Sequence, residues 1–114
     1  MLKTDKSPMQ TKTYGAVSHT APELLLEGKL SKGCDVYSFG VLMWEMYAGE
    51  RPYYGMTSAQ IINHVSKGRG LTLSMGCPLP LRKFIQRCCS HKREERPTFI
   101  QILEELRELE EELV

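Results

Sequence analysis

The stretch Asp35-Val-Tyr-Ser-Phe-Gly-Val-Leu-Met-Trp-Glu-Met-Tyr-Ala-Gly49 decides the fold, because it reads as one nearly all-apolar helix. Between Val36 and Ala48 only Ser38 and Glu45 are clearly polar. A surface helix keeps a single apolar stripe, so a helix that is apolar on most faces should be surrounded by protein. The run is shorter than the roughly 20 apolar residues that cross a bilayer. We therefore expect it to form the central helix of a globular domain.

Both ends of this stretch carry helix-boundary residues. The carboxylate of Asp35 suits the first turn, where backbone N–H groups are unpaired and the helix dipole is positive. Gly49 suits the other end, where a left-handed residue closes a helix. Gly40 lies inside and should cost about 1 kcal/mol relative to alanine. We expect another backbone to approach the helix at Gly40.

Length and composition limit the possible classes of protein. A chain of 114 residues is one domain or part of one. Its net charge of +1 implies no strong attraction to nucleic acid or to an anionic membrane. The first twenty residues lack the apolar segment of a secretory signal. The four cysteines lack Cys-x-x-Cys spacing, which predicts free thiols in a reducing compartment; they are Cys34, Cys77, Cys88 and Cys89. We therefore expect a cytoplasmic protein.

The rest of the chain predicts helices and loops. Residues 1–20 lack any helical or strand period and read as a loop. Pro22 begins a short helix that Gly28 should stop. Three more helices are expected over 59–67, capped by Thr57 or Ser58, over 80–89, and after Thr98, with apolar positions Phe99, Ile102, Leu106, Leu109 and Leu113. No stretch alternates convincingly as a strand, so we predict a mainly α fold.

Three separated motifs coincide in order. The segment 15–23, Gly-Ala-Val-Ser-His-Thr-Ala-Pro-Glu, resembles the Gly-Thr-x-x-Tyr-x-Ala-Pro-Glu end of a protein-kinase activation segment. The segment 35–40 resembles the Asp-x-Trp/Tyr-Ser-x-Gly start of the kinase F helix, and 96–99 resembles the Arg-Pro-[Ser/Thr]-Phe before the last helix. Each motif alone is weak, but together they resemble the C-terminal lobe of a protein kinase of the tyrosine-kinase-like group. The resemblance implies an activation-segment remnant over 1–20, a partial C-terminal lobe over 21–109 and an acidic helix end over 110–114.

The resemblance assigns structural roles to four residues. It implies that Glu23 and Arg96 form a largely buried ion pair, since a planar guanidinium holds a carboxylate with two bonds. The alternative is two solvated charges. Asp35 would accept hydrogen bonds from the backbone of the catalytic loop, in addition to or instead of its role at the helix end. Gly40 belongs to the matched F-helix motif, and we expect Asp35 and Gly40 to be adapted to neighbours outside this chain.

A ledge for the residue after the phosphoacceptor is also implied by the resemblance. It would contain Gly15, Ala16 and the segment from His19 to Glu23. Ala16 replaces the usual Thr, and His19 replaces the common Tyr or Trp, so the sequence departs from the Ser/Thr pattern, while the tyrosine-kinase pattern is also missing. We expect a Ser/Thr-directed parent. The preceding hydroxyls are candidate regulatory phosphorylation sites, namely Ser7, Thr11, Thr13 and Tyr14.

Motifs for ATP and Mg²⁺ are missing from the sequence. It contains no Gly-x-Gly-x-x-Gly, no His-Arg-Asp and no Asp-Phe-Gly, on which phosphoryl transfer depends. We expect Met1 to fall just after an Asp-Phe-Gly motif. We expect the chain alone to bind no cofactor and to be inactive. ATP and Mg²⁺ are expected to act in a longer parent that supplies the N-terminal lobe. Losing the cover of four to six apolar side chains would cost on the order of 10 kcal/mol, so we expect a marginal or aggregation-prone fragment, or one that needs a partner.

Three alternatives compete with a truncated active kinase. A metal site at Cys88, Cys89 and His91, with Cys34 or Cys77, is disfavoured because adjacent helical cysteines diverge by about 100°. We expect Cys88 to pack as a small apolar residue, and His91 and His64 to lie on solvated surfaces. A coiled-coil seam on the last helix would span only about two heptads. The third alternative is a regulatory kinase remnant that binds substrate or partner proteins without catalysis.

Overall fold

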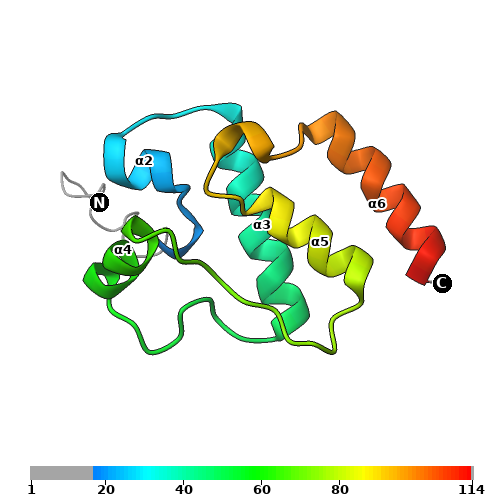
Figure 1. Cartoon of the computed structure of the whole chain (residues 1–114), viewed down its shortest axis with the longest axis horizontal. Coiled ribbons are helices and arrows are strands. Elements are labelled where there is room, and N and C mark those ends of the chain that lie inside the picture. Colours follow the sequence, from blue (N-terminus) through cyan, green and yellow to red (C-terminus); the bar gives the residue numbers. More distant parts are fainter. Residues whose placement is uncertain (1–16, 114) are drawn as a thin grey trace, which may run out of the picture.

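The computed structural model describes residues 17–113, and within this range the chain is helical, with no strand. The elements are η1 (Val17–His19), α2 (Pro22–Glu27), α3 (Lys32–Ala48), α4 (Ser58–Ser66), α5 (Leu79–Cys88), η2 (Arg93–Glu95) and α6 (Phe99–Leu113). Figure 1 shows α3 in the middle, with α2 and α4 on one side and α6 on the other. The predicted mainly α fold, expected from the C-terminal lobe of a protein kinase, is therefore confirmed.

Helix α3 is the central element, as its sequence predicts. It begins three residues before Asp35, with Ser31 in extended backbone at its N-terminal boundary, and Asp35 lies in its first turn. Gly49 ends it in the left-handed region at φ 71° and donates its N–H to the Glu45 carbonyl. The buried side of the helix comprises Cys34, Val36, Tyr37, Gly40, Val41 and Trp44.

Helix α5 and helix α6 cover one side of α3. The largest core cluster joins residues of all three helices, namely Val36, Trp44, Phe84, Ile85, Cys88, Ile102 and Leu109. The Trp44 indole N–H donates to the Thr72 carbonyl at 2.8 Å, which ties the loop before α5 to the same core. Burying this apolar surface is the main force that holds the three helices together.

On the other side, η1, α2 and α4 form a second group. Val17 is buried against Ile61 and Val65 of α4. Ala21 packs with Tyr37 of α3 in a separate buried cluster. The expectation that all of residues 1–20 form a loop is wrong for 17–19, which form a 3-10 turn, because burial of Val17 fixes this segment on α4. Residues 1–16 lie outside the described part of the chain.

The helix ends follow their capping residues. Thr57 accepts a hydrogen bond from the Gln60 N–H, and the Gln60 side chain accepts one from the Thr57 N–H, which makes a capping box at α4. Thr98 and Gln101 make the same exchange at α6. Gly28 closes α2 in the left-handed region, as predicted. Local side-chain chemistry therefore sets these boundaries.

Several large apolar side chains of α3 and α6 are exposed within the described chain. Five large apolar side chains there are 44–72% exposed, namely Leu42, Met46, Phe99, Ile100 and Leu103. The inner side of α6 packs into its own domain through Ile102 and Leu109, while the Leu113 side chain lies outside the described part. The positions proposed for a coiled-coil seam are thus partly used in the core. No helix among the described residues is long and apolar enough to cross a membrane.

Candidate functional site

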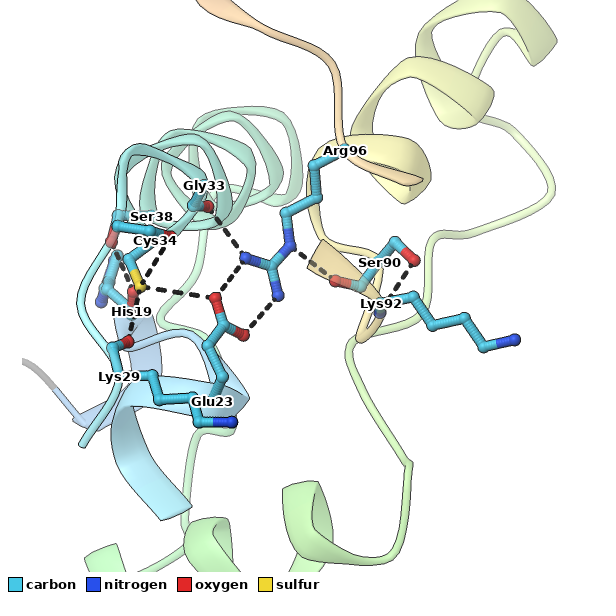
Figure 2. A network of polar contacts seen from close by, with 10 residues as sticks. His19, Glu23, Lys29, Gly33, Cys34, Ser38, Ser90, Lys92 and Arg96 are labelled. Atoms are coloured by element: carbon cyan, nitrogen blue, oxygen red, sulfur yellow. Dashed lines mark hydrogen bonds and ion pairs between the residues drawn. The ribbon is translucent and has the colours of Figure 1, made fainter. Parts of the chain in front are cut away.

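Glu23 of α2 and Arg96 after η2 form the ion pair that the family resemblance implies (Figure 2). The two Arg96 terminal nitrogens donate to the two Glu23 carboxylate oxygens, each at 2.8 Å. The Arg96 side chain is 1% exposed and that of Glu23 is 13% exposed. The pair therefore joins two segments that are 73 residues apart in sequence.

Backbone carbonyls take most of the remaining Arg96 donors. The Arg96 side chain also donates to the Gly33 carbonyl at 2.9 Å and, from Nε, to the Ser90 carbonyl at 2.7 Å. Its guanidinium carbon lies 5.1 Å from the centre of the Tyr37 ring. A buried cation needs both a counter-charge and hydrogen-bond acceptors, and this arrangement provides them.

The hydrogen bonds from Arg96 lower the pKa of Glu23 to about 2, although partial burial acts in the opposite direction. The Cys34 thiol adds a weaker hydrogen bond to a Glu23 oxygen at 3.4 Å and lies 3.3 Å from the Lys29 carbonyl. The carboxylate is therefore held ionised well below neutral pH. This contact of Cys34 was not predicted, because spacing in the sequence gives no sign of it.

His19 connects the segment 17–20 to the central helix. Its Nε2 lies 2.9 Å from a Glu45 carboxylate oxygen, and its Nδ1 lies 2.9 Å from the Ser18 hydroxyl. The Ser38 hydroxyl donates to the His19 carbonyl at 2.6 Å. The only two clearly polar residues in the core of the α3 sequence, Ser38 and Glu45, therefore both contact His19. Of the three ledge residues that the resemblance indicates, Gly15 and Ala16 lie outside the described residues, together with Ser7, Thr11, Thr13 and Tyr14.

A groove of about 420 Å³ lies beside this contact. His19 and Glu45 line one part of it, and the loop after α3 lines another with Arg51, Pro52, Tyr53, Tyr54, Gly55 and Met56. Its surface is thus mostly polar, and among the described residues the lining includes His19, Glu45 and Arg51. The groove therefore offers hydrogen-bond donors and acceptors to a ligand. It was not predicted, because its walls come from separate parts of the sequence.

Tyr53 shapes the groove through an unusual backbone. It is the one residue other than glycine in the described chain with positive φ, at 56°. Its ring packs edge-on against His64, with 5.6 Å between the ring centres. Burial raises the pKa of the Tyr53 hydroxyl, whose oxygen is enclosed within the domain. Strained backbone of this kind is often retained at binding surfaces.

Gly40 and Asp35 have different surroundings. A Cβ built on Gly40 would lie 2.7 Å from Cys88 Cβ and 2.7 Å from Cys89 Sγ. The expected close approach at Gly40 is therefore present, but the neighbour is α5 of this chain, so the interpretation that Gly40 is adapted to a neighbour outside the chain is wrong. Asp35 is exposed, and its side chain has no hydrogen-bond partner among residues 17–113.

The cysteines lie apart from any chelating arrangement. Cys88 is fully buried in the core, where it packs as a small apolar residue. Burial raises the pKa of the Cys88 and Cys89 thiols to about 12. His91 is half-buried, with its Nε2 enclosed and without a partner in the described chain, so the expected solvated position is wrong. In the described range no group of three or more His, Cys, Asp or Glu side chains is arranged to hold a metal ion.

Comparison with known proteins shows a family match over residues 1–106, to the model described as protein tyrosine and serine/threonine kinase. The chain is 41% identical to human ephrin type-A receptor 8 over 106 residues, which is 90% of this chain and 10% of the receptor. It is 38% identical to human tyrosine-protein kinase Fer, covering 79% of the chain and 11% of Fer. It is 33% identical to a Dictyostelium discoideum protein named Probable LIM domain-containing serine/threonine-protein kinase, covering 96% of the chain and 17% of that protein. The chain thus spans about a tenth of the length of the human relatives.

Proposed function

Because this chain belongs to the protein tyrosine and serine/threonine kinase family, we propose that it forms the substrate-holding part of a kinase domain. In the longer parent polypeptide, this domain transfers the terminal phosphoryl group of ATP to a serine or threonine hydroxyl of a protein. The observation that carries the proposal is the groove beside the His19–Glu45 contact, which Ser38 also fixes to the central helix. A groove that is fixed to the central helix in this way would position the acceptor, and positioning is a large part of phosphoryl-transfer catalysis.

The choice of serine or threonine as the acceptor has separate support. One relative, the Dictyostelium protein whose name states serine/threonine-protein kinase, matches 96% of this chain. We propose that the parent acts in the cytoplasm, where the four cysteines of this chain would remain reduced thiols.

ATP and Mg²⁺ would be held by the parent and not by this chain. The sequence lacks the Gly-rich loop, His-Arg-Asp and Asp-Phe-Gly, and no described side-chain group is arranged for a metal ion. The described residues would bind the protein substrate, and the bound nucleotide would supply the phosphoryl group. We propose that the isolated chain is inactive. The alternative function is a regulatory module that binds a substrate or partner protein at the same groove without catalysis.

A phosphorylation assay tests this proposal. The complete reading frame that contains these residues and the 114-residue chain alone are each incubated with radiolabelled ATP, Mg²⁺ and matched peptides that carry Ser, Thr or Tyr as the acceptor. We expect the complete product to label the Ser and Thr peptides, and the chain alone to label none. Labelling of Tyr alone would contradict the proposed acceptor. A folded complete product that binds peptides without labelling any of them would indicate the regulatory alternative.

A further inference from the structure

The charged and ionisable side chains along the groove differ in whether they contact a partner. His19 and Glu45 lie in mutual contact at 2.9 Å, and each is about one-third exposed. Arg51 lines the same groove, is exposed, and forms no ion pair or hydrogen bond within residues 17–113. Among the described residues Glu45 is the one carboxylate that lines the groove, and it contacts His19 and forms no ion pair as a counter-charge to Arg51.

Nearby acidic residues do not supply that counter-charge. Glu50, the neighbour of Arg51 in sequence, lines a different hollow beside Trp44 and Thr72. The Arg51 guanidinium is therefore available to a ligand, and its planar donors match a carboxylate. Tyr54, which is 81% exposed at the same groove, offers a hydroxyl and an aromatic face to the same ligand.

We propose that this groove selects peptides with an aspartate or glutamate close to the phosphoacceptor, and that Arg51 is the residue that recognises the acidic side chain. The inference rests on the proposed function and specifies its substrate class. His19 has a positioning role, because its contact with Glu45 keeps that carboxylate occupied. Without His19, Glu45 would lose the hydrogen bond that holds it, and its carboxylate could compete with an acidic peptide for Arg51.

Peptide binding to the 114-residue chain tests the proposal without catalysis. Fluorescein-labelled peptides that contain one serine and, beside it, Asp, Asn or Lys are titrated with the chain, and fluorescence anisotropy is recorded at low ionic strength. We expect the Asp peptide to bind about two- to fivefold more tightly than the Asn peptide, which is the range for an exposed ion pair. High salt should reduce this difference, because it screens exposed charges.

Charge reversal provides the sharper measurement. Arg51→Glu should remove the preference for Asp and favour the Lys peptide by a similar factor. Arg69→Glu is the matched control, because Arg69 is exposed but does not line the groove. This variant should prefer the Asp peptide as strongly as the unaltered chain does. His19→Gln should also weaken binding of the Asp peptide while Arg51 is intact. Thermal denaturation of each variant checks that its fold is retained.

The outcomes separate this inference from the proposed function. Equal binding of the three peptides by the unaltered chain, or the same loss from Arg51→Glu and Arg69→Glu, would overturn the role of Arg51. Peptide labelling by the complete reading frame that is indifferent to Asp, Asn or Lys would overturn it as well, while leaving kinase activity established. Selective binding of the Asp peptide by a complete product that never labels peptides would support the inference and contradict the catalytic function.

Discussion

Replacing Glu23 by Gln should destabilise the fold severely, because the change leaves a buried guanidinium without its counter-charge. The Arg96 side chain is 1% exposed, so water cannot replace the lost carboxylate. Hydrogen bonds to the Gly33 and Ser90 carbonyls would remain, but neither carries a full negative charge. Removing one partner of a buried pair typically costs about 3–5 kcal/mol. The lowered pKa of Glu23, about 2, agrees with a strong interaction.

Urea denaturation followed by tryptophan fluorescence measures this cost. Trp44 is the single tryptophan, is 8% exposed and donates to the Thr72 carbonyl, so its emission reports loss of the core. With a slope of about 1.5 kcal/mol per molar urea, a loss of 3–5 kcal/mol lowers the midpoint by about 2–3 M. A domain of ordinary stability, about 5–15 kcal/mol, would then be close to unfolding without urea at the lower end of that range.

The matched control is the surface pair of Arg87 and Glu105. Their side chains are 48% and 25% exposed, so Glu105→Gln should cost at most about 1 kcal/mol. The double variant Glu23→Gln with Arg96→Met removes both buried charges and should recover part of the loss, because no uncompensated cation remains. A loss below about 1 kcal/mol for Glu23→Gln, equal to that of the control, would refute the reasoning.

Three further results are expected. As pH falls from 4.5 towards 2, the unaltered chain should lose the stability that ionised Glu23 contributes, because the pKa of Glu23 is lowered in the folded state. Urea midpoints measured across this range should show that Glu23→Gln lacks this part of the pH dependence. Gly40→Ala should lower the free energy of unfolding by about 2 kcal/mol, because overpacking against Cys88 and Cys89 outweighs the gain in helix propensity. A variant more stable than the unaltered chain would contradict this contact. Cys88 and Cys89, with pKa about 12, should resist alkylation until urea unfolds the chain, as mass spectrometry would show; rapid labelling in the native state would be inconsistent with their burial.

The helical framework could be predicted because its signals are local. Gly28 and Gly49 adopt the left-handed conformation expected at helix ends, and Thr57 and Thr98 form the predicted caps. Apolar periodicity also indicated two positions of α6 that face the core, Ile102 and Leu109. The central helix begins at Lys32, so that Asp35 lies in its first turn, as expected.

The groove could not be predicted from the sequence, because its contacts are non-local. His19 meets Ser38 and Glu45 at separations of 19 and 26 residues, and no local pattern signals either pairing. The positive φ of Tyr53 was missed because glycine or asparagine is expected in that conformation. The resemblance indicated His19 as part of a ledge, whereas the unpaired charge of Arg51 depends on the arrangement of side chains in space.

The long sequence separation between Glu23 and Arg96 has a consequence for folding kinetics. Their contact closes a loop of 73 residues, whereas the capping boxes close within three residues. Loop closure over such a distance costs chain entropy that is recovered only when the intervening helices have packed. The pair should therefore be absent from the folding transition state, and Glu23→Gln should act mainly by accelerating unfolding. The ion pair thus sets how long the folded domain lasts, with little influence on how quickly it forms.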